Sequence, residues 1–137
     1  MARVYGFEKL EVWQLAMELI RAVYGLASRL PKTETFGIGD QLRRSSVSVA
    51  LNIAEGRAAD TDLEFRRFLG IALRSVVEVQ ACMRICLSLG MIDRGDADTT
   101  CESCDRLEAK LRVFKRRLTR NVLPNAKQRT SGVERQA

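Results

Sequence analysis

The chain has 137 residues, 46% of them hydrophobic and 29% charged, with only 2 prolines and 9 glycines. This composition excludes a disordered chain and is typical of one helix-rich domain with its own core. No apolar run approaches the roughly 20 residues that span a bilayer, and the first residues lack the apolar segment of a signal peptide. We therefore expect a cytoplasmic protein that does not contact membranes.

The excess positive charge lies in the last quarter of the sequence. Residues 1–104 contain 13 Lys and Arg against 14 Asp and Glu, residues 105–137 contain 10 against 3, and the whole chain has a net charge of +6. Such a basic segment attracts polyanions, so nucleic acid or an acidic protein surface is the expected partner. The alternative is a solvated helix face followed by a soluble tail.

Histidine is absent from the sequence. Its absence removes the commonest general base and the most frequent metal ligand. No Gly-rich phosphate loop or dinucleotide fingerprint is present either. Glu55 and Glu78 could act as paired carboxylates, but such residues more often satisfy polar groups inside a bundle. The sequence thus predicts a non-enzyme without a cofactor.

Two helices are predicted in the first half of the chain. The first covers residues 8–30 and stops at Pro31, and the second covers residues 40–57 with Asp40 as a candidate cap. The apolar face predicted for the first helix consists of Leu10, Trp13, Ala16, Met17, Ile20, Tyr24, Ala27 and Leu30. Trp13 and Tyr24 are expected to fill the core or an interface.

The third predicted helix covers residues 61–89. Thr61 and Glu64 have the spacing of a capping box, and apolar residues at helical spacing follow them. Gly90 is expected to end the helix because glycine commonly follows a helix C-terminus.

The fourth predicted helix covers residues 96–122 and begins with Asp96 or Asp98 as its cap. Its apolar residues recur in alternating steps of three and four. Short connections make sequential helices antiparallel neighbours, so residues 1–124 are predicted to form an up-down-up-down four-helix bundle. The polar, aperiodic residues 125–137 are predicted to be a disordered tail.

The second helix carries an unusual stripe of polar residues. Its members follow one another at steps of four and three, which places them on one face beside an apolar stripe. An exposed stripe would more commonly contain Lys and Glu, so we expect a buried or subunit-facing hydrogen-bond network. With Arg44 beside the stripe, the residues predicted for this polar seam and for subunit packing are Gln41, Arg44, Ser45, Ser48, Asn52 and Glu55.

Three segments resemble a known protein family. They are the residues around Phe7-Glu8-Lys9-Leu10, the run from Gln41 to Gly56 that ends in Asn-Ile-Ala-Glu-Gly, and the run from Phe65 to Glu78. Together they resemble the intervening-sequence proteins, four-helix bundle proteins encoded within inserts of some bacterial large-subunit ribosomal RNA genes. The sequence departs from the family pattern at Arg74, where a small residue is usual, so close packing at that turn is in question.

The resemblance implies more than the residue pattern does. It implies an up-down bundle that assembles into a ring-shaped homopentamer. It also implies kinship with the accessory variability protein of diversity-generating retroelements, which binds nucleic acid and a reverse transcriptase. A reverse transcriptase or another nucleic-acid enzyme is therefore an expected partner, beside RNA or DNA and further copies of the chain.

Four cysteines fall on the apolar faces of the last two helices, at positions 82, 86, 101 and 104. An antiparallel hairpin would bring the two pairs level with each other, which would permit a Cys-only zinc site or disulfides. Free cysteine in a reducing cytosol also packs as a small apolar residue, and we favour this core role. No metal site is therefore predicted.

The fourth helix carries a basic band beside its apolar face. No base-reading or stacking motif accompanies it, so binding is expected to depend on phosphate contacts and little on sequence. The residues predicted to bind nucleic acid are Arg112, Lys115, Arg116, Arg117 and Arg120. The function predicted from the sequence is a homo-oligomeric scaffold for nucleic acid, and the alternative is a protein-interaction adaptor that does not bind nucleic acid.

Overall fold

The computed structural model describes residues 2–136 and the side chains of residues 2–120. Four α-helices and two short 3-10 helices make up the described chain, in which no strand occurs. The prediction of an all-α, four-helix protein is therefore confirmed. The helices are η1 (Gly6–Lys9), α1 (Glu11–Ala27), η2 (Lys32–Glu34), α2 (Ile38–Ala58), α3 (Asp62–Ser88) and α4 (Arg94–Gln136).

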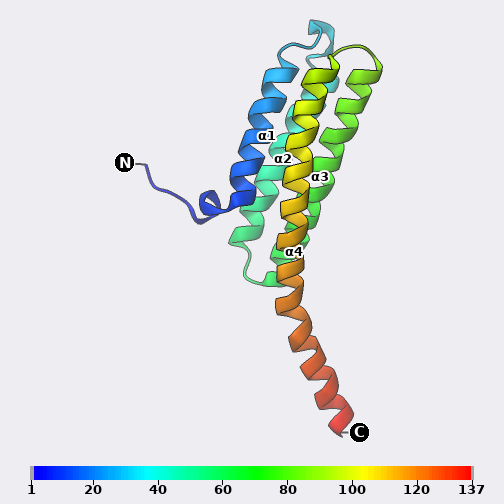
Figure 1. Cartoon of the computed structure of the whole chain (residues 1–137). Helices are drawn as coiled ribbons and strands as arrows, with labels where there is room; N and C mark the ends of the chain where they lie inside the picture. Colours follow the sequence, from blue (N-terminus) through cyan, green and yellow to red (C-terminus); the bar gives the residue numbers. More distant parts are fainter. Residues whose placement is uncertain (1, 137) are drawn as a thin grey trace.

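The four long helices pack in a closed cycle. Helix α2 packs against α1 and α3, and α4 packs against α3 and α1. Figure 1 shows the α1–α2 and α3–α4 connections at one end of the bundle and the α2–α3 connection at the other, while the C-terminal part of α4 extends past the bundle. No helix within the described residues combines the length and the hydropathy needed to cross a membrane.

Helix α3 begins and ends where the sequence predicts, within one residue at each end. The Thr61 hydroxyl accepts a hydrogen bond from the Glu64 backbone N–H at 3.1 Å, which caps the first turn. Gly90 follows the last turn with φ of 70°, a conformation that L side chains rarely adopt. The backbone N–H of Met91 donates to the Cys86 carbonyl at 2.9 Å and that of Gly90 to Leu87 at 3.1 Å, which completes a Schellman motif.

The caps predicted for α2 and α4 are wrong. Asp93 caps α4, because its Oδ1 accepts from the Asp96 backbone N–H at 2.8 Å, so neither Asp96 nor Asp98 is the cap. Helix α2 starts at Ile38, and Asp40 lies within its first turn, where it forms an ion pair with Arg44 at 2.9 Å. At α4 the error reflects a choice among three nearby aspartates, whereas α2 begins after Gly37, which has no side chain to act as a cap.

The core uses only part of the apolar face predicted for the first helix, of which Ala16, Ala27 and Leu30 are buried. Trp13 and Ile20 are only partly buried and Tyr24 is 46% exposed, although all three belong to the predicted apolar face. Helix α1 carries two adjoining apolar stripes, and the aliphatic one faces the other helices while the aromatic one lies at its edge. The buried residues of α1 are Val12, Ala16, Leu19, Val23, Leu26 and Ala27.

Helix α4 is longer than predicted. It runs to Gln136, so the structure differs from the predicted end at residue 122 and from the disordered tail predicted for residues 125–136, and residue 137 lies outside the described residues. The prediction relied on Pro124 as a stop. A proline removes one backbone hydrogen bond within a helix but does not forbid its continuation, and the sequence beyond it contains good helix formers.

Candidate nucleic-acid interface

The basic residues of α4 lie beside and opposite its buried face. Leu111 and Leu118 are buried in the core, and Phe114 packs against Phe65 of α3 with ring centroids 5.0 Å apart. Of the residues predicted to bind nucleic acid, Lys115 is half-buried, and Arg112, Arg116, Arg117 and Arg120 are exposed.

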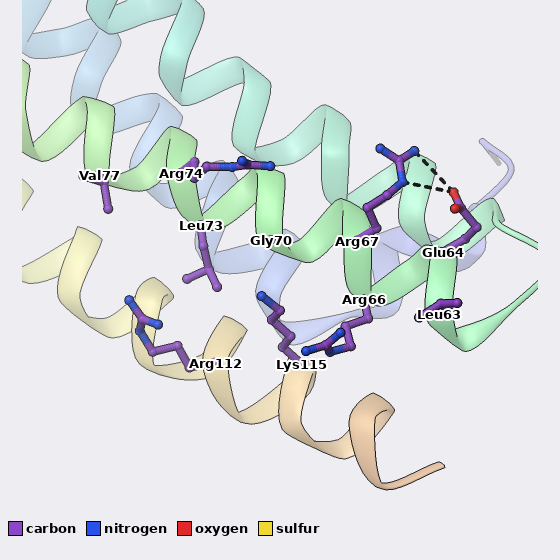
Figure 2. Close-up of a pocket in the computed structure, with 10 residues that line it drawn as sticks. All are labelled: Leu63, Glu64, Arg66, Arg67, Gly70, Leu73, Arg74, Val77, Arg112 and Lys115. Atoms are coloured by element: carbon purple, nitrogen blue, oxygen red, sulfur yellow. Dashed lines mark hydrogen bonds and ion pairs between the residues drawn. The ribbon is translucent and has the colours of Figure 1, made fainter. Parts of the chain in front are cut away.

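A groove of about 660 Å³ runs between α3 and α4, and we call it the basic groove (Figure 2). Arg112 and Lys115 extend into it from α4, and three arginines come from α3. Five cations therefore face one carboxylate. The lining residues are Leu63, Glu64, Arg66, Arg67, Gly70, Leu73, Arg74, Val77, Arg112 and Lys115.

Two of these five cations have carboxylate partners. The Arg112 Nη2 atom lies 2.8 Å from Oε1 of Glu108, and Arg67 lies 3.3 Å from Glu64. The hydrogen bond from Arg112, together with a second from Gln80, lowers the pKa of Glu108. Among the described side chains, the other three cations, Arg66, Arg74 and Lys115, have no ion pair. The basic groove thus keeps a positive potential that is available to an anion.

Sequence reasoning missed the arginines of α3. Arg66, Gly70 and Arg74 recur at steps of four, which places them along one face of a helix. The charge count hid this signal because acidic residues elsewhere in residues 1–104 offset the positive charge of these arginines. Arg74 is exposed at the groove, while its neighbour Ser75 is buried, so Arg74 leaves the close packing of α3 undisturbed.

The predicted polar seam forms in part, and it joins α2 to α3 within one chain. The hydroxyls of Ser48 and Ser75 lie 2.9 Å apart, and the Asn52 amide donates to the Ser48 carbonyl at 2.8 Å. The Gln41 amide donates to Glu78, and Ser45 donates to the Gln41 carbonyl at 2.8 Å.

Other members of the seam face a second hollow. Arg44, Asn52 and Glu55 line a space of about 530 Å³ beside the exposed Tyr24 and Leu51. Glu55 has no hydrogen bond or ion pair among the described residues, so the predicted network does not include it. The Gln41 amide donates a hydrogen bond to Glu78, whereas Glu55 lies in this separate hollow. Among the described residues, the carboxylates of Glu55 and Glu78 therefore share no hydrogen-bond partner.

The cysteines occupy the core, as the favoured prediction states. Cys82, Cys86 and Cys104 are buried, Cys101 is half-buried, and all four are free. Within the described part of the chain, no group of three or more His, Cys, Asp or Glu side chains is placed to hold a metal ion. Burial raises the pKa of each thiol, and that of Cys104 reaches about 12.

This burial predicts a loss of stability at alkaline pH. The Cys104 thiol titrates near 9.0 when solvated and at about 12 when folded, so above pH 9 the unfolded chain releases a proton that the folded chain retains. The stability that the buried, protonated thiol contributes is fully present below pH 9. As the pH rises from 9 toward 12, the free energy of unfolding falls by up to about 1.4 kcal/mol per pH unit. Urea unfolding between pH 8 and pH 11 measures this slope, and Cys104→Ala should make it shallower. An unchanged slope in the variant would contradict the assignment to Cys104.

Comparisons with known proteins agree with the fold. A family model described as 23S rRNA-intervening sequence protein matches residues 8–113. A crystal structure of a protein of unknown function from the S23 ribosomal protein family of Bacteroides thetaiotaomicron superposes with a TM-score of 0.69 at 22% identity, covering 73% of this chain and 94% of that one. None of the curated proteins matches the chain. The structural likeness shows a shared fold, and the family match covers the bundle and the start of the basic band.

Proposed function

The chain belongs to the 23S rRNA-intervening sequence protein family, and from this premise we propose that it is a non-catalytic, homo-oligomeric scaffold that binds nucleic acid. The binding surface is the basic groove together with the exposed cations of α4. It contacts phosphates and has little preference for sequence. In this proposal the protein works in the cytoplasm and needs no cofactor, and it can serve as an accessory to a nucleic-acid enzyme such as a reverse transcriptase.

The observation that carries this proposal is the convergence of cations from two helices on one groove. Arg66 and Arg74 of α3 face Lys115 of α4 without carboxylate partners among the described residues. Cations with free N–H groups displace condensed counterions from a nucleic-acid backbone, which favours binding without reading bases. No row of exposed aromatic side chains lies within the groove to stack bases.

The proposed assembly is a ring-shaped homopentamer of antiparallel up-down-up-down subunits. The alternating positions of the helix connections in Figure 1 support this subunit topology. The hollow beside α2 supplies a candidate subunit contact, because the exposed Tyr24 and Leu51 adjoin the polar Arg44, Asn52 and Glu55. A ring would repeat the basic groove around its circumference, and several weak contacts would then combine into useful avidity.

Light scattering tests the assembly. Each chain has a mass of 15.4 kDa, so we expect a species near five times that mass at micromolar concentration. Leu51→Glu places a charge in the proposed contact and should shift the mass toward that of the monomer, because burying an unpaired charge is unfavourable. Val77→Glu is the matched control, since Val77 is similarly exposed but lies in the basic groove. A monomeric wild type would contradict the ring and the avidity it provides.

Fluorescence anisotropy tests the proposed ligand. Two RNA strands and two DNA strands of unrelated sequence should bind with affinities within about threefold of one another, because phosphate contacts carry no sequence information. A strong preference for one sequence would contradict this mode of binding.

A protein-interaction adaptor is the second candidate. Leu63 and Val77 line the basic groove and are 57% and 50% exposed, which suits an acidic partner with apolar side chains. No binding to any of the four strands at low salt would favour this function over the first.

A further inference from the structure

A small cationic hollow adjoins the basic groove between α3 and α4. It has a volume of about 160 Å³, and Arg66, Arg112, Lys115, Arg116 and Thr119 line it. Four of these five residues are cations and none is acidic, unlike the larger groove, which includes Glu64. We use the name cationic hollow for this site.

Arg66 is held at this site without a protein acceptor. Its Nε atom is buried and has no hydrogen-bond partner among the described residues. The neighbouring Arg67 and Arg112 differ, because Glu64 and Glu108 accept hydrogen bonds from them. Folded proteins leave few buried donors unpaired, and this guanidinium without a protein acceptor lines a hollow that an acceptor from outside the chain can enter.

The backbone of α3 allows Lys115 to approach. A Cβ atom added at Gly70 would lie 3.3 Å from the Lys115 Nζ atom, so the amine rests close against the helix at a position without a side chain. Figure 2 shows Lys115 extending from α4 toward Gly70, with the Arg66 guanidinium on the same side of the groove. The Thr119 hydroxyl already donates to the Lys115 backbone carbonyl at 3.0 Å. The hydrogen-bond donors left for a ligand in the hollow are therefore the N–H groups of its cations.

From this arrangement we propose that the cationic hollow binds one phosphate group, with Arg66, Lys115 and Arg116 as its ligands. Three cations converging from two helices suit an oxyanion that offers several oxygens, and guanidinium groups bind phosphate through paired hydrogen bonds. The hollow opens beside the basic groove, along which a polynucleotide backbone can continue. The source of the phosphate is then a nucleic-acid backbone, and this part of the proposal rests on the proposed function.

The test compares Arg66→Gln with Arg84→Gln. Both variants remove one arginine charge from α3, but Arg84 is exposed and lines neither the hollow nor the basic groove. Arg66→Gln should weaken oligonucleotide binding by about 10-fold or more, because it removes charge-assisted hydrogen bonds, whereas a screened surface charge changes affinity by about threefold or less. Arg66→Lys retains the charge and should recover part of the loss.

Inorganic phosphate provides a second readout that is independent of nucleic acid. At about five times its dissociation constant, it should raise the melting temperature of the wild type and of Arg84→Gln by about 2–4 °C over chloride of equal ionic strength. Arg66→Gln should show no such rise. Equal melting temperatures of the variants in chloride alone establish that the fold is intact.

The outcomes separate this site from the proposed function. Salt-dependent oligonucleotide binding that Arg66→Gln and Arg84→Gln reduce equally, with no effect of phosphate, would overturn the site and leave the proposed function standing. An Arg66-dependent effect of phosphate without any oligonucleotide binding would support the site, assign it to a free phosphate or phosphomonoester, and overturn the proposed function.

Discussion

Replacing Lys115, Arg116, Arg117 and Arg120 with glutamine is expected to weaken binding to unrelated oligonucleotides by on the order of 50-fold at 0.15 M salt. This figure assumes that each chain loses about three phosphate contacts, each of which releases about 0.7 counterion from a single strand. The slope of log K against log salt should flatten by roughly 2 units for the same reason. Glutamine is a good helix former, so α4 should stay folded.

Arg112 is left in place in this variant for a structural reason. Its guanidinium donates to Glu108, whose pKa it lowers, and removing it would leave that half-buried carboxylate without its main partner. A fourfold substitution that includes Arg112 would therefore mix a loss of phosphate contacts with a change in local packing. The four residues chosen have no ion pair among the described side chains.

The matched control is Arg21, Lys32, Arg57 and Arg84 changed to glutamine. These four residues are exposed, have no ion pair in the described part of the chain and lie away from the basic groove. The control removes the same net charge as the α4 variant. Because its four residues lie away from the basic groove, it should change oligonucleotide affinity by only a few-fold. An equal loss in both variants would mean that net charge, and not the surface of α4, controls binding.

Gly56→Ala is expected to destabilise the bundle by about 1–3 kcal/mol, although alanine is the better helix former by about 1 kcal/mol. A Cβ atom at position 56 would lie 2.8 Å from Cδ1 of Phe65 and 2.9 Å from Cβ of Phe68. The second of these atoms cannot move without the backbone of α3, so the two helices would have to separate. Urea unfolding, with light scattering to check the assembly, measures the change.

Gly25→Ala is the control for this prediction. It also lies inside a helix, but the nearest atom to an added Cβ is the flexible end of Arg29, at 3.8 Å. With room for the methyl group, the substitution should stabilise the protein by about 0.5–1 kcal/mol. If Gly56→Ala stabilised the protein by the same amount, the close packing of α2 on α3 would be contradicted.

The substitution Gly56→Ala should also affect the binding surface. Phe65 packs against Phe114, which directly precedes Lys115 in α4. A displaced Phe65 would therefore shift the residue that positions one wall of the groove. Stability and oligonucleotide affinity are expected to fall together in Gly56→Ala, whereas the glutamine variant of α4 should lose affinity alone.

Local signals predicted much of the fold. Four segments with helical spacing, Thr61 as a cap and Gly90 as a helix end are properties of short stretches, and the structure reproduces them. Which face of α1 is buried could not be predicted from the local sequence alone. Two apolar stripes adjoin there, and only the position of the neighbouring helices decides that Leu19 and Val23 are buried while Tyr24 is exposed. The choice of Asp93 over Asp96 as a cap depended on the α3–α4 turn in the same way.

The candidate site was predicted in part for the same reason. The basic band of α4 is visible as a run of charges, so Arg112 and Lys115 could be named from the sequence. Arg66 and Arg74 are far from that run, and only the packing of α3 on α4 brings them beside it. The resemblance drew attention to Asn52 and Gly56, but their roles in a Ser48 hydrogen bond and in the close approach of Phe68 depend on contacts that no spacing reveals.

The salt dependence of wild-type binding is the most direct test of phosphate recognition by this surface. Anisotropy titrations of one labelled single strand at several salt concentrations between about 0.05 and 0.3 M would give log K against log salt. Three to four phosphate contacts for one engaged subunit predict a linear fall with a slope of roughly −2 to −3, and more negative values if several subunits engage. Binding whose affinity does not change across this range would contradict a phosphate-contacting function for the basic groove and the outer face of α4.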